Sequence, residues 1–588
     1  MGFLDVNSSL TGRCWTGPDA STERLTEAMI QQTGHPRAVC ALLVSRGISA
    51  EGSAKFLNPQ LRALLPDPRG LKDMQPAASR FLQALKSRER IAIFADYDVD
   101  GGSSAALLIW WLRQMGHTAT LYVPDRLTEG YGPNPKAMTE LAAAHSLIVC
   151  VDCGTVSHDA IAAVDGTDVI VLDHHLGGET LPPALAVVNP NRQDESGDLG
   201  HLCAAGVVFL MLVELGRQQR EAGIKGPDLI SMLDLVALAT VADVAPLIGI
   251  NRALVRQGLK VMARRDRPGL VALADIAKMD SAPNTHHLGF AMAPRINAGG
   301  RIGKSDLGAR LLACADPAEA QSIAEHLDGL NSERREIEQH VQNAALQQVE
   351  SRADNTPLVW AAGHGWHPGV VGIVAARIKE MTNRPTVIIG IENGEGKGSG
   401  RSVSGIDLGA AVQCLASEGL LSKGGGHKMA AGLSLTEATI EPAMARLSEL
   451  LEKQGAGRQG PKDLRLDGVL MPGAATVDLV EQLDTVGPFG AAAPAPRFGF
   501  ANMRISFSKR VGTAHLKLRF GDSSGTQLDA IAFGAFDSAL GGALESHGGG
   551  LFHIAGRLEI NEWRGRKTPQ VRIEAVSYTH LTLPTKWI

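Results

Sequence analysis

Carboxylate and imidazole side chains follow directly after three short apolar segments of the chain. Such side chains are common ligands of divalent cations in proteins. Ligands gather at the carboxyl ends of strands in open parallel sheets, so three strands that end in these residues would bring them to one edge. We therefore expect a metal site there. The candidates are Asp96, Asp98 and Asp100 after residues 91–95, Asp152 after 147–151, and Asp173, His174 and His175 after 169–172.

A further carboxylate, Asp243, lies in the stretch Ala239-Thr-Val-Ala-Asp-Val. This stretch is too apolar to leave the carboxylate solvated, and a buried carboxylate needs a partner, for which a cation is the simplest choice. Oxygen ligands with one imidazole favour Mn²⁺ over Zn²⁺, with Mg²⁺ as a workable substitute. Two such ions, about 3.5–4 Å apart and bridged by one carboxylate, form a site that hydrolyses phosphoesters. Each motif alone could equally be a helix cap, a turn or a polar pair, but the four together predict a metal site.

The segments that precede these residues have the pattern of a parallel sheet. Runs of four or five apolar residues suit strands that are buried on both faces. The stretches between them, 103–115, 135–144 and 158–164, have helical patterns, and residues 118–123 are expected to add a strand. This alternation predicts a doubly wound α/β domain.

The remainder of the chain divides by composition into further units. Residues 316–352 predict a long solvated helix, interrupted at Gly329, and a second α/β unit follows it. Alternating runs after residue 464 predict a small β-barrel. The expected organisation is an N-terminal extension (1–60), a catalytic domain (61–315), the linking helix (316–352), a smaller α/β domain (353–452), a Gly-rich linker (453–462), an OB-like barrel (463–576) and a tail that continues no pattern (577–588).

The overall charge excludes a uniformly basic surface. The chain has 588 residues with 57 Lys+Arg against 62 Asp+Glu, a formal net charge of −5. Residues 497–572, however, contain 11 Lys+Arg and 6 Asp+Glu, with Phe507, Phe520 and Trp563 between the basic residues. This composition is typical of an OB-fold that binds a single strand by its phosphates and stacks the bases on aromatic rings. An ordinary barrel with a solvated basic face is the alternative.

The cysteines and the apolar segments indicate a cytoplasmic protein. Seven cysteines are scattered along the chain, and Cys150 and Cys153 lie in or beside an apolar run, so we expect them in the core rather than in a redox pair. The N-terminus lacks the pattern of a secretory signal. The most apolar stretch, 232–250, carries two aspartates, which excludes a membrane span.

The acidic and histidine motifs resemble those of the DHH phosphoesterase superfamily, and within it those of the RecJ single-strand-specific exonucleases. The likeness extends from about residue 47 to residue 576. It includes Gly398-Ser399-Gly-Arg401 and Gly424-Gly-Gly-His427, which are similar to the DHHA1 domain of that family. The resemblance implies a parallel-sheet DHH catalytic domain, a smaller DHHA1 domain joined to it by the long helix, and a C-terminal OB-like barrel.

The resemblance also implies a role for each residue of the site. Asp98 and Asp100 would each hold a metal, Asp152 would bridge the two ions, and His174 and Asp243 would complete the second site. His175 would lie against the scissile phosphate. Asp96 and Asp173, beside the ligands, would fix their orientation. The residues expected to bind the strand are Arg126, Arg301, Ser399, Arg401 and His427.

The function implied is that of a monomeric exonuclease with two divalent cations, Mn²⁺ preferred, that degrades single-stranded DNA from 5′ to 3′ into nucleoside monophosphates during DNA repair and recombination. A single-strand-binding protein and a helicase are the expected partners. Two alternatives stay open: a DHH/DHHA1 phosphodiesterase or phosphatase for short oligonucleotides or nucleotides, and a non-catalytic replication scaffold. The barrel favours a polymeric substrate, and the intact acidic set argues against a scaffold.

Overall fold

A parallel sheet of five strands, in the order β3-β2-β4-β5-β6, forms the centre of the first domain. Its three central strands are buried almost throughout, because helices cover both faces of the sheet. This confirms the predicted doubly wound domain. The strands are β2 (Ile91–Ala95), β3 (Ala119–Tyr122), β4 (Leu147–Val151), β5 (Asp168–Leu172) and β6 (Ala186–Val188).

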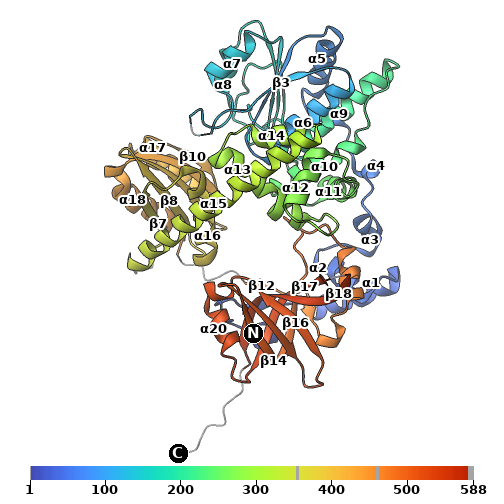
Figure 1. Cartoon of the computed structure of the whole chain (residues 1–588), viewed down its shortest axis with the longest axis vertical. Coiled ribbons are helices and arrows are strands. Elements are labelled where there is room, and N and C mark those ends of the chain that lie inside the picture. Colours follow the sequence, from blue (N-terminus) through green and yellow to red (C-terminus); the bar gives the residue numbers. More distant parts are fainter. Residues whose placement is uncertain (1, 127, 353–355, 458–462, 564, 580–588) are drawn as a thin grey trace, which may run out of the picture.

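The computed structural model describes residues 2–126, 128–352, 356–457, 463–563 and 565–579. The first domain lies at the top of Figure 1, the second α/β domain at its left and the barrel below. In the described part of the chain, no helix has the length and apolarity that crossing a membrane requires.

The helices of the first domain pack on the two faces of the sheet. Alternate residues of each strand face opposite sides, so the strands contribute to two separate cores. The first predicted helix begins at Val99, four residues earlier than the sequence indicated, because Asp98 caps it. One face carries α5 (Met74–Lys86), α6 (Val99–Gln114) and α9 (Ala204–Glu221), and the other carries α7 (Pro135–Ala142) and α8 (His158–Ala162).

A helical layer extends the same core away from the sheet. It follows β6 and α9 along the chain and packs against α6 and α9 through a continuous set of apolar side chains. Its helices are α10 (Leu233–Ala242), α11 (Gly249–Met262), α12 (Pro268–Ile276), a π-helical turn (His287–Met292), α13 (Ala293–Ile302) and α14 (Leu307–Ala313).

The long helix α15 (Pro317–Arg352) is continuous over 36 residues, so the predicted interruption at Gly329 is wrong. A glycine in a helix costs only about 1 kcal/mol relative to alanine. Packing on both sides of Gly329 offsets that cost: Leu327 belongs to the core of the first domain, and Val341 belongs to a core beneath the second. The helix is therefore a packed connection rather than a solvated one.

The second domain has a mixed sheet in the order β10-β11-β9-β8-β7, in which only β7 and β8 run parallel. Its core lies between this sheet and two of the helices that follow. The elements are β7 (Val359–His364), α16 (Pro368–Thr382), β8 (Thr386–Glu392), β9 (Glu395–Arg401), α17 (Leu408–Ser417), β10 (Lys423–His427), β11 (Ala430–Thr436) and α18 (Ile440–Lys453).

Five strands close into a barrel at the C-terminal end, because β14 pairs with both β15 and β17. Closure removes the free strand edges that an open sheet would expose. Phe520 is fully buried in this core, so its expected place among basic residues on the surface is wrong. The strands are β14 (Phe498–Val511), β15 (His515–Gly521), β16 (Gln527–Ala532), β17 (Leu551–Trp563) and β18 (Arg566–Tyr578).

The N-terminal residues pack on the barrel. Leu42 and Leu43 of α2 (Arg37–Ser45) share a core with the barrel strands. Strand β1 (Trp15–Thr16) pairs in parallel with β12 (Leu464–Arg465). The two ends of the chain thus form one structural unit, which also contains α1 (Ala20–Thr33), α3 (Ala50–Leu57) and α19 (Val477–Asp484).

Two further expectations concern the C-terminal tail and the linker before the barrel. Ser577 and Tyr578, assigned to the tail by pattern, continue strand β18 opposite β17. Residues 580–588, and residues 458–462 of the expected linker, lie outside the described part of the chain.

Candidate metal centre

The predicted ligands meet at the carboxyl edge of the parallel sheet. The His174 Nε2 atom lies 3.2 Å from an Asp152 carboxylate oxygen and 3.7 Å from one of Asp100, and His174 Nδ1 lies 3.9 Å from Asp243. Within each of three overlapping groups, one ligand atom per residue lies within 4.8 Å of the others. The groups are Asp152 with His174 and His175, Asp100 with His174 and Asp243, and Asp96 with Asp98 and Asp152.

The aspartates that follow β2 contact the N-termini of two helices. Asp98 accepts hydrogen bonds from the backbone N–H of Asp100 at 2.8 Å and of Gly101 at 3.2 Å, which starts α6. The buried Asp100 carboxylate accepts from the backbone N–H of Ala204 and Ala205 at 2.6 and 2.8 Å, at the first turn of α9. Helix N-termini stabilise negative charge. Capping and metal binding are therefore compatible roles for this motif.

Asp96 and Asp152 each leave one carboxylate oxygen without a hydrogen-bond partner among the described residues. Both side chains are buried, at 3% and 2% exposure. Burial raises the pKa of both groups, and nearby carboxylates raise them further. An unpaired buried oxygen of this kind is costly, and a cation at the edge would satisfy it. The donor set, carboxylates with imidazole, fits divalent cations of the Mn²⁺ type.

Asp173 is fully hydrogen-bonded. Its carboxylate accepts from the backbone N–H of Thr155 at 3.0 Å, from the backbone N–H of His174 at 2.7 Å, and from His175 Nδ1 at 2.8 Å. Although burial raises the pKa of Asp173, its bonds with His175 and Thr155 outweigh burial and lower it. Conversely, burial lowers the pKa of His175, but Asp173 raises it to about 9. Asp173 therefore holds the histidine loop in place and favours the protonated form of His175.

Tyr131 contacts the centre, although the sequence assigned it no role. Its hydroxyl donates to the backbone carbonyl of Asp152 at 3.0 Å and lies 3.0 and 3.2 Å from the two ring nitrogens of His175. Asn189 and Asn191 donate to the backbone carbonyls of His175 and His174. These two asparagines follow β6, so the strand-end pattern that found the aspartates could have found them.

Asp243 lies at the C-cap of α10, where the helix ends and the chain turns toward the cluster. Its side chain is 29% exposed, so the burial expected from the apolar sequence around it is only partial. Partial burial and the Asp100 charge raise the pKa of Asp243 to about 8. Its neighbour Val244 has φ +59°, a left-handed conformation that β-branched residues rarely adopt. Such strain is concentrated at functional sites.

Four of the five predicted strand-binding residues lie close together: Arg126, Arg301, Ser399 and Arg401. Burial, then the charge of Arg126, lower the pKa of Arg301 to about 10, and the same two causes lower that of Arg401. Arg401 Nη1 donates to Ser399 Oγ at 2.9 Å, and Arg301 Nη1 donates to the Gly369 carbonyl at 3.1 Å. None of the three arginines has a carboxylate within ion-pair distance in the described part of the chain. Crowded cations of this kind would favour an anionic ligand.

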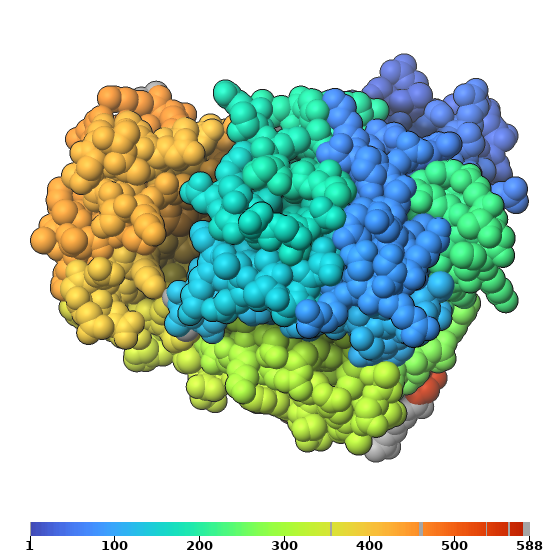
Figure 2. All heavy atoms as spheres, turned by 90° about the horizontal axis from the view of Figure 1, so that it is seen from above, coloured from blue at the N-terminus to red at the C-terminus, as the bar shows by residue number. Residues whose placement is uncertain are grey.

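The fifth strand-binding candidate, His427, lies apart from this group. It is exposed at the end of β10, and it pairs in register with Ala430 of β11, which in turn pairs with Arg401 of β9. His427 and Arg401 are thus two strand spacings apart, about 10 Å. Figure 2 shows a groove between the second domain, in yellow and orange, and the first domain, in teal.

The basic face predicted for the barrel is partly neutralised by ion pairs. Arg510 pairs with Glu545 at 2.6 Å, Arg519 pairs with Asp529 at 2.7 Å, and Lys567 pairs with Glu481 at 3.3 Å. Lys509 and Lys517 have no such partner among the described residues and face each other across β14 and β15. Phe507 is 47% exposed beside them, as expected, and Phe533, which the sequence analysis missed, is 49% exposed. The Trp563 side chain and Arg564 lie outside the described residues.

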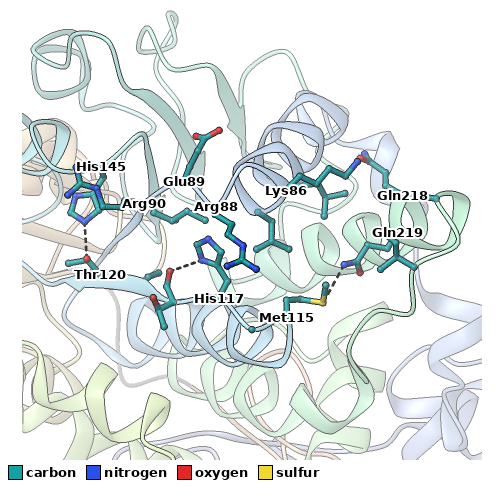
Figure 3. Close-up of a pocket in the computed structure, with 18 residues that line it drawn as sticks. Lys86, Arg88, Glu89, Arg90, Met115, His117, Thr120, His145, Gln218 and Gln219 are labelled. Atoms are coloured by element: carbon teal, nitrogen blue, oxygen red, sulfur yellow. Dashed lines mark hydrogen bonds between the residues drawn. The ribbon is translucent and has the colours of Figure 1, made fainter.

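A cavity of about 630 Å³ lies at the opposite edge of the sheet, where β2 and β3 begin. Figure 3 shows its lining, with Arg88 and His117 near the middle and His145 hydrogen-bonded to Thr120 at the end. None of the predicted metal ligands lines this cavity. It is therefore separate from the metal centre.

Comparisons with known proteins match all three parts of the chain. Residues 90–240 match the N-terminal domain of the DHH family, residues 355–453 match the DHHA1 domain, and residues 466–575 match the RecJ OB domain.

Individual relatives match the chain over most of its length. The single-stranded-DNA-specific exonuclease RecJ of Dickeya dadantii (strain 3937) is 40% identical, covering 92% of this chain and 96% of its own. That of Escherichia coli (strain K12) is 37% identical with the same coverage. The crystal structure of RecJ in complex with Mn²⁺ from Thermus thermophilus superposes with a TM-score of 0.77 and 30% identity, covering 96% of this chain and 79% of that one. The resemblance inferred from the motifs is confirmed: the chain belongs to the RecJ family.

Proposed function

We propose that this protein is a metal-dependent exonuclease that hydrolyses single-stranded DNA from the 5′ end to nucleoside monophosphates. The observation that carries the proposal is the cluster of Asp98, Asp100, Asp152, His174 and Asp243 at one edge of the sheet, in which a buried carboxylate oxygen of Asp152 accepts no hydrogen bond from the described part of the chain. Relatives named single-stranded-DNA-specific exonucleases support the reaction and the substrate.

Two divalent cations would occupy the centre, Mn²⁺ in preference to Mg²⁺. Asp98 and Asp100 would each hold an ion, Asp152 would bridge both, and His174 and Asp243 would complete the second position. Such a pair supplies an activated water and stabilises the charge that develops on the phosphate. Related structures contain either Mn²⁺ or Mg²⁺, which supports divalent cations of this class.

The chain's own residues would position the phosphate. His175, whose protonated form Asp173 favours, would lie against a phosphate oxygen, and Tyr131 would hold its ring in place. Asp96 would orient the ligands beside it. Arg126, Arg301 and Arg401 would bind the phosphates that follow, since planar guanidinium groups grip phosphate oxygens in pairs. Ser399 would orient Arg401, and His427 would contact the strand further along.

The barrel supports a polymeric rather than a short substrate. Like charges directly opposite each other on neighbouring strands destabilise a sheet, yet Lys509 and Lys517 occupy such a pair. A phosphate between them would remove the repulsion. The exposed rings of Phe507 and Phe533 would stack on bases, which only a single strand presents.

The family likeness alone supports the remaining parts of the proposal. These are the 5′→3′ polarity, the role in DNA repair and recombination, action as a monomer in the cytoplasm, and cooperation with a single-strand-binding protein and a helicase.

Strands labelled at either end test the proposal. With Mn²⁺, a 5′-labelled single strand of 30 nucleotides should release labelled mononucleotide from the first turnover, whereas a 3′-labelled strand should shorten stepwise and a blunt duplex should remain intact. The same assay is run on an RNA strand of the same sequence and on a dinucleotide, to measure whether RNA and short substrates are also cleaved. Equal rates per phosphodiester on the dinucleotide and the long strand would instead favour a short-oligonucleotide phosphodiesterase, and no cleavage of any strand would exclude the enzyme.

A further inference from the structure

One segment joins the barrel to the first domain. Residues 486–494, which we call the docking segment, lie between α19 and β14. Val486 and Phe489 pack in the core of the barrel unit, whereas Ala493 belongs to the core of the first domain. In Figure 1 the orange chain before the barrel rises toward the green helices α11 and α12. The docking segment is therefore anchored on both sides.

Specific contacts fix the segment on the first domain. The Leu247 N–H donates to the Ala491 carbonyl at 2.9 Å, and Thr285 Oγ1 donates to the Phe489 carbonyl at 2.6 Å. At Gly490 an added Cβ would come within 2.7 Å of a Leu247 methyl carbon, so any larger residue there would have to displace the Leu247 side chain. Leu247 lies only four residues after the candidate ligand Asp243. The docking surface and the metal centre thus share one loop.

Arg252 of α11 is the polar centre of this junction. It is 2% exposed, and its guanidinium donates to the carbonyls of Val486, Gly487 at 2.6 Å and Pro488 at 3.3 Å. Its Nε atom donates to the Phe56 carbonyl at 3.2 Å, and the group lies 3.9 Å from the centre of the Phe56 ring. Arg252 therefore holds both the docking segment and the N-terminal helix α3, which packs on the barrel.

The charge of Arg252 is unusual for a buried group. No carboxylate pairs with it among the described residues, and burial, together with the charges of Arg46 and Arg256, lowers its pKa to about 10. A buried cation without a counterion is expensive unless its hydrogen bonds are fully satisfied. Here backbone carbonyls from two distant segments satisfy it. The arrangement is only stable when both segments occupy these positions, which makes Arg252 selective for a single docked geometry.

We propose that Arg252 is a positioning residue that holds the barrel at a fixed distance from the metal centre, so that one strand can occupy both sites at once. The proposal rests on the proposed function. A strand bound at the barrel is presented to the metal centre at a high effective concentration only if the two sites keep a matching separation. Loss of the junction should therefore weaken the use of long strands and leave short substrates unaffected.

Steady-state kinetics of an Arg252→Met variant on a dinucleotide and on a 30-nucleotide strand provide the test. We expect KM for the long strand to rise on the order of tenfold or more, with kcat on the dinucleotide unchanged. Arg252→Lys keeps the charge but cannot reach four carbonyls. Its KM for the long strand should lie between that of the wild type and that of Arg252→Met. Arg264→Met, at an exposed arginine just beyond α11, is the matched control and should behave as wild type.

A second variant tests the junction from the other side without removing a buried charge. Gly490→Val should push the docking segment away from Leu247 and reproduce the long-strand defect. Small-angle scattering should show an increased radius of gyration for both variants and not for the control. Equal losses on both substrates, or unchanged KM for the long strand in both variants, would overturn the proposal. If the wild type cleaves no strand, the proposed function fails, whereas an unchanged radius of gyration refutes the positioning role independently.

Discussion

The like-charged pair on the barrel allows a quantitative prediction. Lys509 and Lys517 face each other across β14 and β15 and lack ion-pair partners in the described part of the chain. If each contacts a phosphate of the bound strand, the double substitution to glutamine removes two such contacts. Glutamine keeps the length and polarity of the side chain, so the barrel should fold unchanged, and loss of the repulsion should slightly raise its stability.

The size of the effect follows from counterion release. Each phosphate contact on a single strand contributes about 0.7 to the slope of log K against log salt, so the double variant should lower the slope by about 1.4. Between 50 and 200 mM salt, the affinity of the wild type should therefore fall about sevenfold more than that of the variant. The difference is largest at low salt, where the wild type gains most from the two charges.

Fluorescence anisotropy of a labelled 30-nucleotide strand, measured with Ca²⁺ in place of Mn²⁺ and over a range of salt concentrations, gives these slopes. Arg510→Gln is the matched control, because Arg510 lies beside Lys509 but is already neutralised by Glu545. Its slope should match that of the wild type. Equal slopes for the double variant and the wild type, or an equal loss in the control, would refute the assignment of this face to the strand.

Three further predictions concern the metal centre. Tyr131→Phe removes the hydroxyl that contacts His175, so kcat should fall about tenfold with little change in KM, and an unchanged kcat would contradict the positioning of His175. The folded protein raises the pKa of Asp243 to about 8. The contribution of Asp243 to the stability of the metal-free protein should therefore be greatest below pH 4 and decline as the pH rises through 8. In thermal unfolding with a chelator, the stability of Asp243→Asn should decline less with rising pH than that of the wild type. Parallel curves of stability against pH for the two proteins would contradict this prediction. A Cβ at Gly101 would lie 2.4 Å from the Asp96 carbonyl, so Gly101→Ala should shift the start of α6 and lower activity about a hundredfold although every ligand remains. Gly70→Ala, where the added atom meets nothing within 4 Å, is its control, and equal activities of the two variants would contradict the argument.

The clustering of the candidate ligands at one edge of the sheet was predictable because its signals are local. Each apolar run ends in its own ligands, and the parallel-sheet rule then places the runs side by side without any knowledge of their contacts. The rule also applies to Asn189 and Asn191, which follow β6. Tyr131 could not be found in this way, because it lies on a loop whose path depends on the whole domain.

Alternation along the barrel strands indicates which side chains face the core. In β15, Leu516, Leu518 and Phe520 alternate with Lys517 and Arg519, which places Phe520 inside the barrel on the pattern alone. In β14 the pairing shifts between Ile505 and Phe507, and this irregularity turns Phe507 outward. A shift of this kind depends on the neighbouring strand, so a single strand does not reveal it.

The association of the two chain ends depends on contacts that are far apart in sequence. The apolar face of α2 indicates that this helix packs on something, but not on what. Its partner lies more than 400 residues away, where Ser45 Oγ donates to Asp467. Likewise, nothing near Arg252 in the sequence predicts that its hydrogen-bond acceptors lie at residues 486–488. Local patterns locate elements, whereas the junctions between domains require the fold.

The most direct test of the metal centre is the cleavage of a 5′-labelled single strand by the wild type and by Asp152→Asn during a titration with Mn²⁺. Asparagine keeps the shape of the side chain but loses the charge that would bridge two cations. The wild type should release labelled mononucleotide with a dependence on Mn²⁺ that saturates at two ions per chain, as measured in parallel by equilibrium dialysis. The variant should bind at most one ion and release no product above background. Wild-type rates in Asp152→Asn, or cleavage that persists in a chelator, would contradict a hydrolytic centre built on this cluster.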